Sequence, residues 1–129
     1  MQTAQKSLTV VIADDDNTTC RVLRLLLREH GHQVVGEAHD GEKAVELCET
    51  YKPDIAFLDI EMPRLNGHEA AKKIRESNPD IGVIIVSAMS TLSNVRSAVQ
   101  AGVNGFVVKP FNAVKVVEAI DNCVKQKRQ

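Results

Sequence analysis

Short apolar runs alternate with amphipathic segments along the whole chain. Five runs rich in Val, Ile and Leu are typical of strands buried on both faces, over residues 8–13, 33–38, 54–59, 81–87 and 105–108. Apolar residues at intervals of three and four predict helices over residues 17–30, 41–51, 66–77, 91–101 and 112–125. The pattern therefore predicts five strands, each followed by a helix.

Strict alternation of buried strands and helices favours a parallel sheet with helices on both faces. Right-handed crossovers leave few topologies for such a chain, and we expect an α/β doubly wound sheet in the order 2-1-3-4-5, a flavodoxin-like (βα)5 fold. Helical spacing puts two sets of side chains inward, from the helices 17–30 and 41–51: Cys20, Leu23, Leu26 and Leu27, then Ala44, Leu47, Cys48 and Tyr51.

The composition limits the size and the kind of surface. With 129 residues, we predict a single domain over 1–129 with frayed ends at 1–7 and 126–129. Aromatic residues are only 3% of the chain, so the core must be aliphatic and we expect no base-stacking surface. The net charge of −1 gives no global nucleic-acid footprint, and we expect no nucleic-acid partner.

Cysteine and histidine positions argue against a soft-metal site. Cys20, Cys48 and Cys123 stand far apart on apolar phases of helices, which favours buried thiols over a disulfide or a metal site. We expect the four histidines on the surface, without an i, i+4 pair: His30, His32, His39 and His68. Apolar runs fall short of the ~20 residues of a membrane span, so a soluble, cytoplasmic protein without membrane insertion is expected.

Charge is unevenly distributed along the chain. Residues 1–80 carry 10 basic and 15 acidic side chains, whereas residues 81–129 carry 6 basic and 2 acidic side chains. One interpretation is chance clustering on a solvated surface. The other is an acidic site in the first part of the chain and a basic docking face in the last part.

Polar side chains stand where the predicted strands end. Asp14 and Asp15 follow the first strand, Asp59 ends the third, Ser87 the fourth and Lys109 the fifth. In doubly wound sheets, ligands gather at this edge, between strands 1 and 3. Three carboxylates there repel one another, and a hard divalent cation such as Mg²⁺ removes the conflict. The sequence therefore predicts a magnesium site at this edge.

The same edge suits a phosphoryl group. Carboxylates with Mg²⁺, the Lys109 ammonium and the Ser87 hydroxyl can together stabilise three phosphoryl oxygens. The chain has neither a G-x-G-x-x-G nor a Walker A motif, so a carboxylate of the protein is the expected acceptor. Asp16, one residue further along, is instead expected to cap the following helix.

This constellation resembles the response-regulator receiver domain of two-component signalling. The motifs that carry the resemblance are residues 11–16, 57–63 with Gly67, 85–88 and 105–111. Each motif is weak by itself, but four in order at the right strand ends are specific, and together they cover essentially the whole chain. In length, the chain is similar to the stand-alone, chemotaxis-type (CheY-like) members.

The resemblance implies a role for each residue at the acidic edge. Asp59 would be the phosphoacceptor. Asp14 and Asp15, together with Asp59 and the backbone carbonyl of Glu61, would hold Mg²⁺. Lys109 would contact a phosphoryl oxygen, and its bond to the following proline would be cis.

Three further roles follow from the same resemblance. Ser87 would contact a second phosphoryl oxygen and form a switch pair with Phe106, which stands where many members have Tyr and lacks its hydroxyl. Glu61 and Met89 would set the lifetime of the phosphorylated state, because both flank the path of the attacking water.

The implied activity is signalling rather than catalysis on an external substrate. The protein would take a phosphoryl group from a sensor histidine kinase or a histidine phosphotransfer protein and then dephosphorylate itself. It would act on a downstream protein through the face formed by the helix 91–101, the strand 105–108 and the helix 112–125.

Two alternatives use the same fold. A small Mg²⁺-dependent phosphatase of the haloacid-dehalogenase type also has an aspartyl nucleophile, but its nucleophile lies on the first strand and its acidic pair comes last. Here the acidic pair, Asp14 and Asp15, comes first and Asp59 third. An FMN-binding flavodoxin is disfavoured because the loop after the first strand is acidic and would repel a phosphate.

Overall fold

The computed structural model describes residues 7–88 and 91–127. The strands are β1 (Thr9–Ala13), β2 (Gln33–Ala38), β3 (Ile55–Leu58), β4 (Gly82–Ser87) and β5 (Gly105–Val108). The helices are α1 (Asn17–Glu29), α2 (Gly41–Tyr51), α3 (Gly67–Ser77), α4 (Leu92–Gln100) and α5 (Ala113–Lys127). All ten elements lie within two residues of the ranges that the hydrophobic pattern predicts.

The five strands form one parallel sheet in the order β2-β1-β3-β4-β5. This confirms the predicted topology. β1 lies between β2 and β3, so the chain leaves β1 toward one edge of the sheet and later returns on its other side to form β3. The reversal opens the crevice at the carboxyl ends of β1 and β3 in which doubly wound folds bind their ligands.

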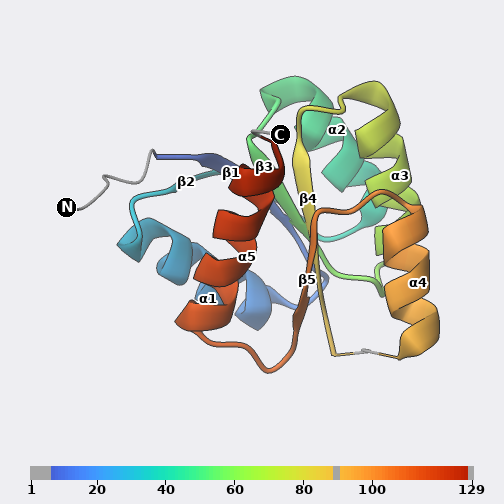
Figure 1. Ribbon diagram of the computed structural model, residues 1–129. Coiled ribbons are helices and arrows are strands. Elements are labelled where there is room, and N and C mark those ends of the chain that lie inside the picture. Colours follow the sequence, from blue (N-terminus) through green and yellow to red (C-terminus); the bar gives the residue numbers. More distant parts are fainter. Residues whose placement is uncertain (1–6, 89–90, 128–129) are drawn as a thin grey trace.

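Helices cover both faces of the sheet (Figure 1). α1 and α5 lie on one face, and α2, α3 and α4 lie on the other. Successive strand residues point to opposite faces, so Val10 and Ile12 enter the core under α1 and α5, whereas Val11 and Ala13 enter the other core. Both cores are mainly aliphatic, as the composition requires.

Side-chain caps start the helices close to the strand ends. Asp16 caps α1, where its carboxylate accepts a hydrogen bond from the amide of Thr18, as the sequence predicts. Asn66 caps α3 in a reciprocal capping box with Glu69. The connection before α1 is short, Asp14 to Asp16, whereas the connection before α3 runs from Asp59 to Asn66.

Two expectations about burial are wrong. Tyr51 was expected inward, but 52% of it is exposed, because α2 ends at this residue and the chain turns away at Lys52. His32 was expected on the surface, but it is buried, and its Nδ1 accepts a hydrogen bond from the amide of Leu8. His30 and His39 are exposed as expected, and His68 is half-buried.

The chain ends also differ from expectation where the structure describes them. α5 continues to Lys127, and the side chain of Gln126 makes two hydrogen bonds with Asn104, so residues 126 and 127 are helical rather than frayed. Ser7 donates a hydrogen bond to the carbonyl of Gly31. The remaining residues expected to fray, 1–6 and 128–129, lie outside the described part of the chain.

All three cysteines are buried in the cores, as predicted. Burial raises the pKa of Cys20 to about 11 and the pKa of Cys48 to about 12, so neither thiol is ionised near neutral pH. Within residues 7–88 and 91–127, no helix is both long enough and apolar enough to cross a membrane.

Candidate functional site

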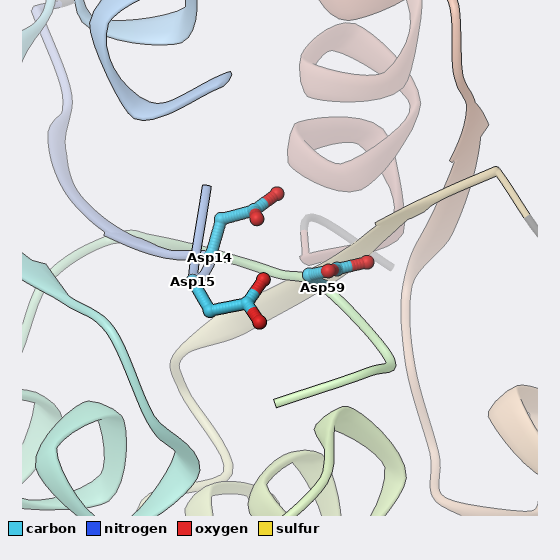
Figure 2. A group of neighbouring side chains, drawn as sticks. All are labelled: Asp14, Asp15 and Asp59. Carbon is cyan, nitrogen blue, oxygen red and sulfur yellow. The ribbon is translucent and has the colours of Figure 1, made fainter. Parts of the chain in front are cut away.

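Three carboxylates meet at the carboxyl ends of β1 and β3. Asp14 and Asp15 directly follow β1, and Asp59 directly follows β3. Each offers an oxygen atom, and these atoms all lie within 4.8 Å of one another (Figure 2). The structure thus brings together the three aspartates that the sequence places at neighbouring strand ends.

Asp14 is the most firmly held of the three. It is 2% exposed, and both of its carboxylate oxygens have donors within the protein. The amide of Asp16 donates to Oδ1 at 2.9 Å, and the ammonium of Lys109 donates to Oδ2 at 2.7 Å. The buried charge of Asp14 is therefore compensated by a fixed cation.

Asp59 is also buried, but it is less completely compensated. The amide of Ile60 donates to Oδ1 at 2.9 Å, and Nζ of Lys109 lies 3.8 Å from the same oxygen. Burial and then the charge of Asp14 raise the pKa of Asp59 to about 6; Lys109 and the Ile60 amide act in the opposite direction, and Asp15 adds a smaller increase. Without a further cation, the site holds more negative charge than it can stabilise.

Lys109 connects the acidic cluster to β4 and β5. Its own amide donates to the carbonyl of Ser87 at 2.9 Å, and its bond to Pro110 is cis, as the family resemblance implies. Burial lowers the pKa of the Lys109 ammonium, but the hydrogen bond to Asp14 and the charge of Asp59 outweigh burial and leave that pKa raised. Lys109 is therefore a permanent cation at neutral pH.

The donor set suits a hard divalent cation. Asp15 is exposed at the rim of the cluster, so the carboxylates are open to solvent on one side. Oxygen ligands and room for water are what Mg²⁺ requires, and the excess negative charge around Asp59 is what a cation would neutralise. Glu61, the fourth expected ligand through its carbonyl, lies two residues beyond Asp59 in an exposed position of the β3–α3 loop.

The expected switch residues lie on neighbouring strands. Ser87 is buried at the end of β4, next to β5, the strand that precedes Lys109. Phe106 is half-buried and packs against the core under α2, α3 and α4. Met89, expected to affect the lifetime of the phosphorylated state, lies outside the described residues.

A groove beside Lys109 was not expected from the sequence. It has a volume of about 390 Å³ and lies between the first turns of α1 and the segment after β5. Its lining residues are Thr18, Thr19, Val22, Ala88, Lys109, Pro110 and Phe111. The hydrophobic pattern could not reveal it, because the groove arises where one helix and two loops from distant parts of the chain meet.

Comparison with known families identifies the family of the chain. Residues 10–121 match the family model described as the response regulator receiver domain. The chain belongs to this family. A relative of this receiver domain is the chemotaxis protein CheY of Thermotoga maritima, 40% identical over 116 residues that cover 90% of this chain and 97% of that protein.

Solved receiver domains have the same fold. The signal receiver domain of a putative NarL response regulator from Mycobacterium tuberculosis superimposes with a TM-score of 0.85 at 34% identity, covering 94% of this chain and 98% of that one. A CheX–CheY complex with BeF3 and magnesium from Borrelia burgdorferi matches with a TM-score of 0.83 at 31% identity, covering 87% of this chain and 85% of that chain.

The protein is therefore a receiver domain of a two-component system. Receiver domains exchange signals with histidine kinases and downstream targets, and the family match covers the acidic residues after both β1 and β3. The alternative of a haloacid-dehalogenase phosphatase finds no support, since both the relatives and the structural neighbours are response regulators or their receiver domains.

Proposed function

We propose that this receiver domain accepts a phosphoryl group on Asp59 from a phosphohistidine of a partner. The observation that carries the proposal is the position of Asp59. Its buried carboxylate lies beside those of Asp14 and Asp15 and 3.8 Å from the Lys109 ammonium. A carboxylate oxygen of Asp59 attacks phosphorus, the P–N bond of the donor breaks, and the departing imidazole takes up a proton.

Asp14, Asp15, Asp59 and the carbonyl of Glu61 are the residues that would hold Mg²⁺. When bound there, the ion would neutralise the carboxylates and the charge of the incoming phosphoryl group. The crowding that raises the pKa of Asp59 to about 6 supports this assignment, because it is the condition that a cation relieves. The magnesium in the Borrelia burgdorferi CheX–CheY complex also supports this assignment, since this chain shares the fold of the matching chain in that complex.

Lys109 and Ser87 are proposed to bind two of the phosphoryl oxygens. The ammonium of Lys109 already lies between Asp14 and Asp59, so a phosphoryl group on Asp59 would form beside it. Ser87 is a buried residue at the end of β4, the strand next to β3. Phosphorylation adds acceptor oxygens there, toward which the hydroxyl can turn, and Phe106 is proposed to follow that movement.

The phosphodonor is proposed to be a histidine kinase or a histidine phosphotransfer protein that docks over α1. The groove between α1 and the segment after β5 opens beside Lys109, and its lining is mainly apolar. Val22 and Leu25 extend this apolar surface along α1, with exposures of 42% and 56%. A protein seated there would place its phosphohistidine near Asp59.

The signal is proposed to leave through the face formed by α4, β5 and α5. This face exposes large apolar side chains, namely Leu92, Val99, Val108 and Val114. Arg96, Lys115 and Lys125 are exposed on the same elements, and a groove of about 610 Å³ runs between β5 and α5. Basic and apolar groups together suit an acidic, amphipathic segment of a downstream protein.

Glu61 and Met89 are proposed to set how long the phosphoryl group lasts. Glu61 is exposed at the rim of the site, two residues after Asp59. An acidic side chain there would hold or repel the water that attacks phosphorus. The bulky Met89 would shield the phosphoryl group from that water. Replacing Met89 with alanine should therefore change the rate of dephosphorylation, and a rate unmoved by changes at both positions would rule out this role.

Labelling with acetyl phosphate tests the acceptor. Intact-mass spectrometry of wild type should show one added phosphoryl group in the presence of Mg²⁺ and none in EDTA. Asp59→Asn should show none in either buffer, and Asp15→Ala should need far more Mg²⁺. Labelling of Asp59→Asn at the wild-type level would place the acceptor elsewhere.

A further inference from the structure

The first residue of α3 contacts the start of the loop that joins Asp59 to this helix. The amide of Gly67 donates to the carbonyl of Ile60 at 2.8 Å. A Cβ atom on Gly67 would lie 2.1 Å from the carbonyl oxygen of Asp59, so only glycine allows this approach. The contact fixes the start of the loop, but not the residues between Glu61 and Asn66.

The middle of the loop rests against α2, an element that carries none of the residues assigned to the site. Gly41 is the first residue of α2 and is buried. Its amide faces the carbonyl of Pro63 at 3.4 Å. A Cβ atom on Gly41 would lie 1.9 Å from the carbonyl oxygen and 2.6 Å from the carbonyl carbon of Leu65. These are backbone atoms, which cannot rotate out of the way as a side chain can.

Charged side chains join the same two segments. Arg64 has a φ of +71°, an uncommon conformation for a residue with a side chain. Its guanidinium lies 3.9 Å from Asp40 and 3.8 Å from Glu42, at either side of Gly41. Both ion pairs are long and solvated, so they contribute little energy. The close backbone contact at Gly41 is the stronger restraint.

We propose that Gly41 is a positioning residue for the phosphorylation site. The proposal rests on the proposed function, in which the Glu61 carbonyl is a metal ligand. Between Glu61 and Leu65 the loop has little freedom, because Met62 is buried and the amide of Leu65 donates to the carbonyl of Pro63 at 2.8 Å. A shift of the Leu65 carbonyl is therefore passed on to Glu61.

The size of the required shift is large for a metal site. A Cβ atom at position 41 needs about 3 Å of clearance where 1.9 Å is present, so the loop or α2 must move by about 1 Å. A misplacement of about 1 Å lowers the rate of a reaction that depends on precise positioning by about 10²-fold. Gly41 thus acts through the loop on the metal and on Asp59, without touching either.

Gly41→Ala and a matched control, Gly36→Ala, test the proposal. Gly36 lies in β2, and the three atoms nearest to its added Cβ would all belong to the side chain of Leu47, the nearest at 3.2 Å. Leu47 belongs to α2, so both variants disturb α2, but only Gly41→Ala disturbs the loop. Two-dimensional NMR titration gives the Mg²⁺ dissociation constant, and acetyl phosphate at saturating Mg²⁺ gives the phosphorylation rate.

Gly41→Ala should bind Mg²⁺ at least about tenfold more weakly and be phosphorylated at least about tenfold more slowly than wild type. Gly36→Ala should stay within about twofold for both quantities, even if it unfolds more readily. Equal Mg²⁺ affinity in Gly41→Ala and wild type would overturn the inference. Failure of wild type itself to bind Mg²⁺ or to be labelled would overturn the proposed function instead.

A measurement on wild type covers the case in which Gly41→Ala does not fold. If α2 positions the metal loop, Mg²⁺ must in turn stabilise the contact of α2 with the loop, because coupling between two sites is reciprocal. Hydrogen exchange at the Gly41 amide should therefore slow at least threefold on adding Mg²⁺. The control is the Gly82 amide, which donates to the carbonyl of Asp54 at the amino end of β4, the end of the strand away from the site. An unchanged Gly41 rate, with Mg²⁺ bound, would overturn the inference.

Discussion

Asp59 combines two properties that oppose each other in the metal-free protein. It must be ionised to act as a nucleophile, yet burial and the nearby Asp14 raise its pKa to about 6. A carboxyl group whose pKa is raised by folding stabilises the fold when protonated, and this stabilisation is lost as the pH rises through the folded pKa. At neutral pH, the ionised Asp59 therefore lowers the free energy of unfolding.

Asp59→Asn should remove this cost. In EDTA at pH 7.5, we expect urea denaturation to show a gain in the free energy of unfolding on the order of 1–3 kcal/mol. The gain should shrink as the pH falls from about 6 to below 3.8, the ordinary pKa of Asp59, because the group is then protonated in both the folded and the unfolded state. Asp80→Asn, at an exposed position, is the control and should change little. A gain that does not depend on pH would contradict this electrostatic account.

Lys109 should contribute most to the free energy of unfolding when no metal is present. Lys109→Met leaves the carboxylate of Asp14, 2% exposed, without its cation. We expect the free energy of unfolding in EDTA to fall by about 3 kcal/mol, the usual cost of breaking a buried ion pair. Thermal unfolding with increasing Mg²⁺ should recover part of the loss, and Lys115→Met, on the exposed side of α5, should lose at most about 0.5 kcal/mol.

The sequence predicted which residues meet at the site, but not what surrounds each one. Asp14, Asp15 and Asp59 could be assigned because each follows a buried run, and the ends of parallel strands meet at one edge. The different environments of Asp14 and Asp59 depend on where the Lys109 ammonium lies, which is a tertiary contact. The burial of His32 has the same kind of cause, since its partner is the amide of Leu8.

Among the helices, α4 has the fewest buried side chains. Of its nine residues only Ala98 is fully buried, whereas Leu92 and Val99 are 66% and 69% exposed. α3, of similar length, has four buried positions. An element with few buried contacts opens at a lower free energy than its neighbours.

Hydrogen exchange should show that α4 opens more readily than α3. In the unphosphorylated protein, we expect amides in the middle of α4 to exchange at least about tenfold faster than those in the middle of α3, since about 1.4 kcal/mol less opening free energy gives this ratio. Mass spectrometry of peptic peptides over the two helices measures it. Equal protection of α3 and α4 would show that packing does not set the stability of α4.

Element boundaries were predictable where a local signal marks them. Asp16 was predicted as a cap, and α1 begins one residue after it. Asn66 was predicted as the first residue of its helix and is instead the cap of α3, one residue before its start. The end of α2 was predicted correctly, but the burial of its last residue and the end of α5 were not. Tyr51 fits the apolar spacing but lies at the last residue of its helix, and Gln126 extends α5 because it bonds to the distant Asn104.

Across the whole molecule, the basic excess of residues 81–129 lies partly on the face formed by α4, β5 and α5. Arg96 and Lys115 are exposed on α4 and α5. Arg96→Glu with Lys115→Glu should weaken binding to the downstream target at least about tenfold at low salt, and less at high salt, because the attraction is screened. Phosphorylation by acetyl phosphate should be unchanged.

Reversal of Lys72 and Lys73, exposed on α3, is the matched control for that experiment. It changes the net charge by the same amount on a different face. Fluorescence titration of the target against both double variants separates a local docking surface from a general effect of charge. Equal weakening by the two pairs would show that only net charge matters.

The division of the interior by the sheet has a consequence for how mutations combine. Leu23 of α1 belongs to one core and Ile74 of α3 to the other, and the backbone of the sheet separates the two sets of side chains. Leu23→Ala and Ile74→Ala should each cost about 2–5 kcal/mol, and a double-mutant cycle should find them additive to within about 0.5 kcal/mol. A damaged core could then be repaired only by compensating changes on its own side, so the two halves of the interior are free to diverge independently.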